Sequence, residues 1–146
     1  MDAFEQAVNA MLSLHEGRRR MMYKCTAGYN TIGVGHNLDA NPISERAIDV
    51  IFADDLASVE SNLTRVLPWW RQEAPARQAA LIDLCFNLGV VRLLAFRNTL
   101  GAWQKKDYAG AASGLMDSLW YKQVGTRGPR IVTMVRTGQM PTDVLQ

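Results

Sequence analysis

The chain has 146 residues, of which 48% are apolar and 21% are charged, with a formal net charge of +2. This is the composition of an ordinary globular domain, and the sequence has no low-complexity segment and no visible internal repeat. No run of eighteen apolar residues exists, so the sequence predicts no membrane-spanning helix. The two cysteines, Cys25 and Cys85, fit free thiols in a reducing compartment better than a disulfide framework.

The first elements are a helix and a hairpin. Apolar residues at spacings of three and four predict a helix over 3–15, with Asp2 as its N-cap and Gly17 at its end. β-branched and aromatic residues predict a hairpin over 22–36, with its turn at Ala27-Gly28. Gly33 and Gly35 alternate with apolar residues there, which leaves one strand face bare enough for close approach.

The rest of the chain reads as helical. Ser44 is the expected N-cap of a long amphipathic helix over 45–66, which Pro68 follows. A nearly all-apolar pattern predicts a buried central helix over 75–88, capped by Gly89. Shorter helices are expected over 92–105, 107–116, 118–123 and 127–137. The predicted fold class is therefore α+β and mainly helical, with one small N-terminal hairpin.

The stretch from residue 16 to residue 36 carries the densest chemistry. Glu16 ends the first predicted helix, and Cys25 and Thr31 follow in the glycine-rich hairpin. An acid and a second polar group held across a cleft are what cleavage of a glycosidic bond requires. Cys25 would otherwise be read as an incidental thiol, and its position between Glu16 and Thr31 favours a functional reading.

This stretch resembles the catalytic region of the T4-type phage lysozymes, the endolysins that cut bacterial peptidoglycan. That family carries Glu, then Asp or Cys, then Thr at this spacing. Further similar segments are the Phe86-Asn87-Leu-Gly region and the stretch from Trp120 to Arg130. The resemblance runs from about residue 4 to 138. The segment after His36 is short, so we expect the third strand of the small lobe to be missing.

The resemblance implies a lysozyme-like fold: one domain over 1–146, with a small lobe over about 16–44 and an interlobe helix over about 45–66. A helical lobe over about 67–146 would include the N-terminal helix. The implied catalytic residues are Glu16 as general acid, Cys25 as second group and Thr31 as the residue that orients water. The implied substrate-binding residues are Phe86, Asn87, Asn98 and Thr99. The implied supporting residues are Arg127, approaching Glu16, and His36, paired with Asp55.

The implied function is a peptidoglycan muramidase that hydrolyses the β-1,4 bond between N-acetylmuramic acid and N-acetylglucosamine and lyses the bacterial host. Cys25 leaves two routes open: as a base it would invert the anomeric centre, and as a nucleophile it would retain it. Three alternatives remain. They are a lytic transglycosylase that uses only Glu16, a non-catalytic wall-binding component of a phage particle, and a zinc amidase that uses His15, His36 and a cysteine.

The expected partner is bacterial peptidoglycan, bound by a monomer without nucleic acid, membrane anchor, metal or cofactor. Two histidines without paired cysteines disfavour a metal site. The N-terminus lacks the pattern of a signal peptide, so we expect a protein of the host cytoplasm that reaches the wall once a holin opens the membrane. Arg18, Arg19, Arg20 and Lys24 surround the candidate site. They suit any anionic polymer or surface, so charge alone does not choose among peptidoglycan, nucleic acid and membrane.

Overall fold

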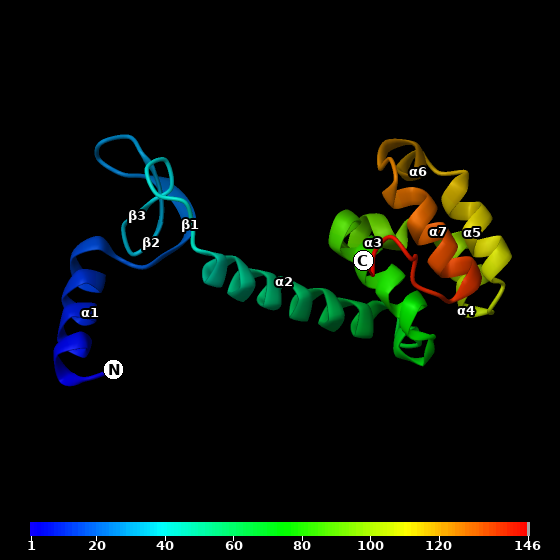
Figure 1. The fold of residues 1–146 in the computed structure, drawn as a ribbon, viewed down its shortest axis with the longest axis horizontal. Coiled ribbons are helices and arrows are strands. Elements are labelled where there is room, and N and C mark those ends of the chain that lie inside the picture. Colours follow the sequence, from blue (N-terminus) through cyan, green and yellow to red (C-terminus); the bar gives the residue numbers. More distant parts are fainter. Residues whose placement is uncertain (146) are drawn as a thin grey trace. The chain divides into compact units, whose positions relative to one another are not determined.

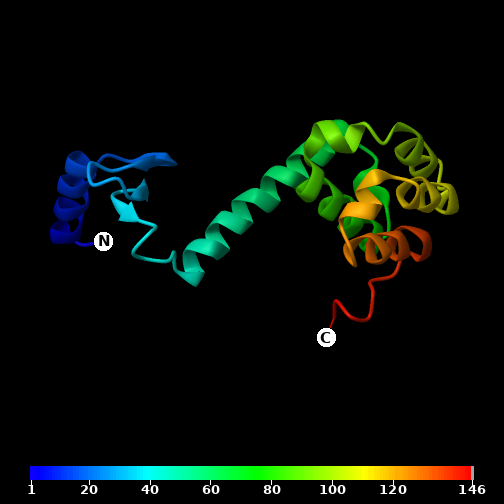
Figure 2. The same ribbon diagram turned by 90° about the horizontal axis from the view of Figure 1, so that it is seen from above.

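A computed structural model describes residues 1–145. The chain forms two compact units, one over Met1–Ile51 and one from Phe52 onward. The boundary falls inside helix α2 (Glu45–Val66), which is continuous across it (Figure 2). Each unit is described separately below. The predicted assignment of the N-terminal helix to the helical lobe stays a prediction.

Helix α1 (Ala3–Glu16) opens the first unit with the expected signals at both ends. The Asp2 carboxylate accepts the backbone N–H of Glu5 at 2.8 Å, and the Glu5 carboxylate accepts the N–H of Asp2 at 2.8 Å. This reciprocal capping box satisfies two otherwise unpaired donors. Gly17 ends the helix at φ +75°, where its N–H donates to the Ser13 carbonyl at 3.0 Å. The predicted cap and stop are both confirmed.

A three-stranded antiparallel sheet follows, with strands β1 (Arg19–Lys24), β2 (Asn30–Gly33) and β3 (His36–Asn37) in that order (Figure 1). The expectation of a missing third strand is therefore wrong. Asp39 explains why, since its carboxylate accepts the backbone N–H of Asn30 at 2.7 Å and the side-chain amide of Asn30 at 3.0 Å. These bonds fold the short loop back onto β2 and give two residues a pairing edge.

The turn between β1 and β2 lies one residue earlier than predicted. The N–H of Gly28 donates to the carbonyl of Cys25 at 2.8 Å, so Thr26 and Ala27 are the central residues. Gly28 follows them at φ +86°. Cys25 is therefore the first residue of the turn and lies next to the paired strand ends Lys24 and Asn30.

The second unit is helical, and its predicted elements are largely confirmed. Helix α2 begins in the first unit, where Ser44 caps it by accepting the N–H of Ala47 at 3.1 Å, and continues into the second. Gly89 interrupts the next long helix with φ 75° and ψ 166°. The helix expected over 92–105 is instead broken at Ala95 and Phe96. The elements after α2 are a short 3₁₀ turn (Trp70–Gln72), α3 (Pro75–Leu94), α4 (Arg97–Gln104), α5 (Tyr108–Met116), α6 (Leu119–Gln123) and α7 (Arg127–Thr137).

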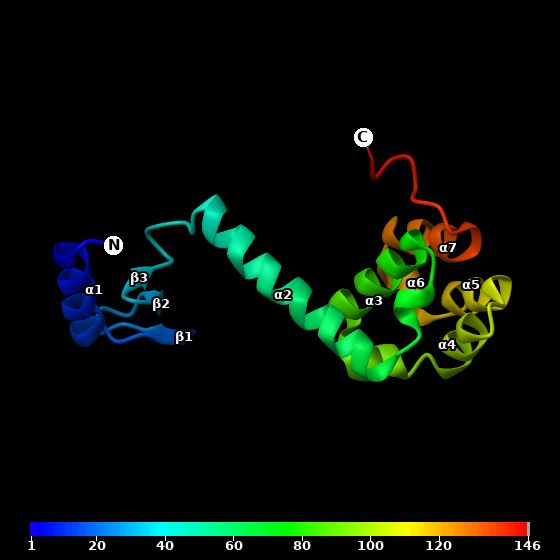
Figure 3. The same ribbon diagram turned by 90° about the horizontal axis from the view of Figure 1, so that it is seen from below.

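The hydrophobic core belongs to the second unit. Helix α3 contributes Leu81 and Leu84, which are almost wholly enclosed; α7 packs against α3, α5 against α7, and α4 against α5 (Figure 3). Trp70 and Trp103 are 1% and 0% exposed, so they are core residues rather than a sugar-stacking surface. In the first unit, by contrast, Thr31 is the one buried residue.

No single helix within residues 1–145 is long and apolar enough to cross a membrane, although α3 and α4 pass that test together as a pair bent by 108°.

The end of α7 is held by a cation from α3. The Arg77 guanidinium donates to the carbonyls of Val135 at 2.7 Å and Arg136 at 3.3 Å, where the last carbonyls of a helix lack partners. It also lies 3.4 Å from the centre of the Tyr108 ring. Gly138 gives this arrangement room, because a Cβ there would lie 2.9 Å from the guanidinium.

We expect Gly138→Ala to lower the free energy of unfolding by about 2 kcal/mol, because alanine at φ +70° is strained and also displaces Arg77. Gly125→Ala is the matched control, since it has φ +57° and open space around its Cβ. It should cost about 1 kcal/mol. Urea unfolding of both variants makes the comparison, and equal losses would contradict a role for the Arg77 contact.

Candidate functional site

Glu16 lies where α1 ends, and its carboxylate packs against the turn between β2 and β3. A Cβ built on Gly35 would lie 2.9 Å from Glu16 Oε2 and 3.1 Å from the carboxyl carbon. Gly35 also has φ +68°, a conformation that favours glycine on its own account. The glycine therefore serves twice, since it makes the turn and leaves space for the acid. The bare strand face expected from the sequence is occupied, at Gly35, by Glu16.

Cys25 lies in the same unit, at the start of the turn between β1 and β2. Hydrogen bonding from the backbone of Tyr29 is the main cause that lowers the pKa of the Cys25 thiol. Desolvation is the next largest effect and raises the pKa, while the backbone of Ala27, the side chain of Thr31 and the backbone of Gly28 lower it further. The thiol is partly accessible. It is thus more readily ionised than an ordinary cysteine, which is the property a base or nucleophile needs.

Thr31 is 3% exposed and lies on β2, beside the turn that carries Cys25. Its hydroxyl donates to the carbonyl of Tyr29 at 2.9 Å, and its side chain is also near enough to Cys25 to help lower the pKa of the thiol. A hydroxyl has one proton, so it cannot donate fully to both acceptors. A charged sulfur is the stronger acceptor, and the Thr31 hydroxyl can turn toward it when Cys25 ionises. Thr31 is therefore placed to stabilise the thiolate.

The predicted substrate-binding residues of the second unit lie in different surroundings. The exposed Phe86 packs against Phe52, with ring centroids 6.1 Å apart. The Asn87 side-chain oxygen accepts the indole N–H of Trp120 at 2.9 Å. That bond fixes the amide and leaves its NH₂ group directed elsewhere.

Asn98 and Thr99 lie in the first turn of α4, after Arg97, and neither is its N-cap. Phe96 occupies that position without a side-chain hydrogen bond, so capping does not explain Asn98. Asn98 is exposed, whereas Thr99 is 5% exposed and packs its hydroxyl against Gly114 of α5. Thr99 thus joins α4 to α5. Substrate binding by these four residues stays a prediction.

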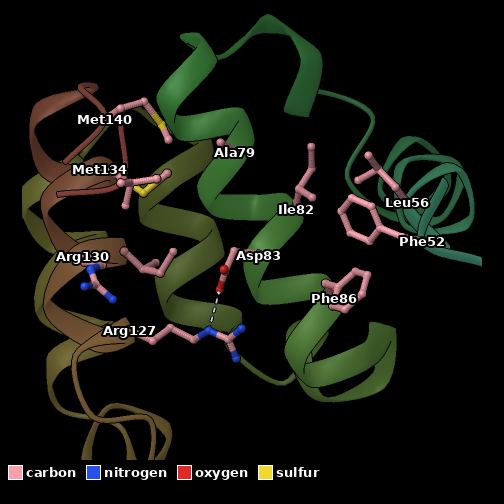
Figure 4. A pocket seen from close by; sticks show the side chains of 12 residues that line it. Phe52, Leu56, Ala79, Ile82, Asp83, Phe86, Arg127, Arg130, Met134 and Met140 are labelled. Atoms are coloured by element: carbon pink, nitrogen blue, oxygen red, sulfur yellow. Dashed lines mark ion pairs between the residues drawn. The ribbon is translucent and has the colours of Figure 1, made fainter. Parts of the chain in front are cut away.

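Arg127 lines an elongated pocket of about 560 Å³ within the second unit (Figure 4). Its Nε lies 3.3 Å from Oδ1 of Asp83, and the two form an ion pair without a hydrogen bond. Burial raises the pKa of Asp83, and the charge of Arg127 opposes that change. The other walls are mostly apolar and include Phe52, Phe86 and Met134.

Two predicted pairings join residues of different units and stay predictions. They are Arg127 with Glu16 and His36 with Asp55. Within its own unit, Nε2 of His36 donates a hydrogen bond to the carbonyl of Asn41 at 3.0 Å. Sequence reasoning chose Arg127 by resemblance but missed Asp83, because one acid on a mainly apolar helix carries no pattern of its own.

The part of the chain that the structure describes contains no cluster of side chains that could bind a metal ion. Over residues 1–145, no three His, Cys, Asp or Glu side chains converge in a way that could hold an ion. The zinc alternative needs His15, His36 and a cysteine to meet, and they do not form such a group. The arrangement that the first unit does offer is a carboxylic acid and an activated thiol on one small scaffold.

Comparison with known proteins gives a consistent result. The sequence model of the family described as phage lysozyme matches residues 13–136. The chain is 27% identical to "Probable T4-type lysozyme 1" of Dictyostelium discoideum over 92% of this chain and 96% of that protein. It is 27% identical to an endolysin of Acyrthosiphon pisum secondary endosymbiont phage 1, over 82% of each.

A further relative is the pre-baseplate central spike protein Gp5 of Enterobacteria phage T4, at 28% identity over 89% of this chain. This chain spans only 28% of the length of that protein.

We expect Cys25 to be alkylated by iodoacetamide at lower pH in the folded protein than in guanidinium, because the turn lowers its pKa. The experiment uses the Cys85→Ser variant, so that Cys25 is the only thiol that can be alkylated. Thr31→Val should move the folded midpoint part of the way back toward that of the unfolded chain. A folded midpoint at or above the unfolded one would contradict activation by the turn.

Proposed function

Because the chain belongs to the phage lysozyme family, and so is a glycoside hydrolase of the muramidase type that acts on peptidoglycan, we propose that Glu16, Cys25 and Thr31 form its catalytic set. The bond cleaved is the β-1,4 link from N-acetylmuramic acid to N-acetylglucosamine. The observation that carries this assignment is the position of the Glu16 carboxylate against Gly35, in the same small unit as the activated Cys25 thiol.

Glu16 is proposed as the general acid. It gives its proton to the glycosidic oxygen as the bond from that oxygen to the anomeric carbon breaks, and the leaving sugar departs as an alcohol. The carboxylate left behind carries one negative charge. Its place at a helix end, fixed by the Gly17 stop and the Gly35 contact, holds the acid in one position.

Cys25 is proposed as the second catalytic group, acting as the thiolate. In the inverting route the sulfur takes a proton from water while the water oxygen bonds to the anomeric carbon. In the retaining route the sulfur itself bonds to that carbon, and water later displaces it. Both routes need the ionised sulfur, which the turn and the Thr31 hydroxyl favour. The burial of Thr31 supports a role in holding the sulfur in addition to the predicted role of orienting water.

The biological role we propose is that of an endolysin, which lyses the bacterial host after a holin has opened the membrane. The similarity to a phage endolysin over 82% of both chains supports this role. A second candidate is a particle-borne enzyme, favoured by the match of most of this chain to part of a central spike protein. Purified particles separate the two, since an endolysin is absent from them and a particle component is present in stoichiometric amount.

We expect Gly35→Ala to lower kcat about a hundredfold, because its Cβ displaces the Glu16 carboxylate. Gly33→Ala is the control. It has nearly the same φ, +67° against +68°, and nothing within 4 Å of its Cβ. Both variants should lose about 1 kcal/mol of stability, but Gly33→Ala should keep most of its activity. Equal loss of activity in the two would show that backbone strain, not contact with Glu16, matters.

We expect Glu16→Gln to lower wall hydrolysis by about a thousandfold or more, with circular dichroism unchanged, because the amide supplies no proton. Cys25→Asp should keep substantial activity, whereas Cys25→Ala should lose most of it. Mass spectrometry of digested peptidoglycan gives the readout. Reducing sugar ends fit hydrolysis, and anhydro ends would mean a transglycosylase. Near wild-type digestion by Glu16→Gln would remove the proposed mechanism.

A further inference from the structure

Strand β1 is an outer strand of the sheet and carries an unusual concentration of positive charge. Arg18, Arg19, Arg20 and Lys24 lie on it or next to it, and all are exposed. Residues 17–38 contain these four cations and no acidic residue. Within residues 1–145, none of the three arginines takes part in an ion pair. The charge of Lys24 interacts with the Asp39 carboxylate, whose pKa it helps to lower.

Two apolar side chains lie among these cations, and no other part of the first unit covers them. Met21 is 81% exposed and Met22 is 58% exposed. Both lie between Arg19 and Tyr23, where the register of β1 against β2 is irregular, and this bulged part of the strand presents both side chains to solvent. The Arg19 guanidinium lies 5.5 Å from the centre of the Tyr23 ring, which adds an aromatic ring to the same surface. We call residues 18–24 the β1 surface.

The combination selects a class of partner. A soluble polyanion such as a nucleic acid or a charged glycan would pair with the arginines but gain little from two exposed methionines. An anionic membrane satisfies both, since lipid phosphates attract cations and the interfacial zone accepts apolar side chains. We propose that the β1 surface binds anionic phospholipid membranes, with the arginines on lipid phosphates and Met21 and Met22 in the interface. This is peripheral binding without a spanning segment.

The proposal is tested with the full chain and vesicles of phosphatidylcholine, alone or with 30% phosphatidylglycerol. Sedimentation should show binding to the anionic vesicles and little to the neutral ones, with binding weakened as salt rises. Binding to both kinds equally would overturn the role of the arginines. The readout is independent of hydrolysis, so it stands or fails separately from the proposed catalytic set.

Substitutions then locate the surface. The combined variant Arg18→Ser, Arg19→Ser, Arg20→Ser should bind anionic vesicles on the order of a hundredfold more weakly. The matched control replaces three exposed cations of the second unit, Arg92, Lys105 and Lys106, with serine and should bind like the wild type. If the control loses as much as the first variant, net charge explains the binding and the β1 surface does not.

The methionines decide between a membrane and a polyanion. The variant Met21→Ser, Met22→Ser should bind vesicles several-fold more weakly and bind a soluble polyphosphate unchanged. Unaltered vesicle binding by this variant would contradict insertion and would leave the arginines as a site for soluble polyanions. Because both side chains are exposed, the fold should survive, and thermal unfolding checks that it does.

Discussion

The contact between the Glu16 carboxylate and Gly35 is the constraint on which the proposed site depends. It joins the end of α1 to the turn between β2 and β3, at a position where any other residue would place a Cβ against the acid. The turn that carries Cys25 belongs to the same antiparallel sheet, one connection earlier. The contact gives the acid a defined position on the same small unit that carries the thiol, and a defined position is what general acid catalysis needs.

The two units stabilise themselves by different means. The second unit has a hydrophobic core around α3 and uses polar contacts to fix its helices, as when the Tyr108 hydroxyl donates to the buried Glu73 carboxylate at 2.9 Å. The first unit buries Thr31 alone. Caps, turns and the Asp39 bonds to Asn30 shape it instead. Short-range polar contacts of this kind set local geometry well and leave much of the surface open for recognition.

Sequence reasoning succeeded where the signal is local. Asp2, Gly17 and Ser44 act at helix ends within a few residues of their partners, and all three do what the pattern predicts. It failed where the local structure depends on contacts between residues that are distant in the sequence. Strand β3 exists because Asp39 folds back onto Asn30. The helix expected over 92–105 is interrupted at Ala95 and Phe96, where neither a glycine nor a proline predicts a break.

The candidate site shows the same division. Glu16, Cys25 and Thr31 were recognisable by type, order and family resemblance. Their environment was not, because no pattern of residues states that Gly35 receives a carboxylate or that backbone groups around Tyr29 lower the pKa of a thiol. Similarly, Asp83 beside Arg127 follows from two helices meeting in space and from no motif.

The central claim is that an ionised Cys25 takes part in hydrolysis, and the pH dependence of kcat/KM on a soluble peptidoglycan fragment tests it most directly. The rising acidic limb of the wild type should follow the pKa measured for the Cys25 thiol. In Cys25→Asp that limb should move to markedly lower pH, because a carboxyl group ionises below a thiol. An acidic limb that is the same in both proteins would contradict the account.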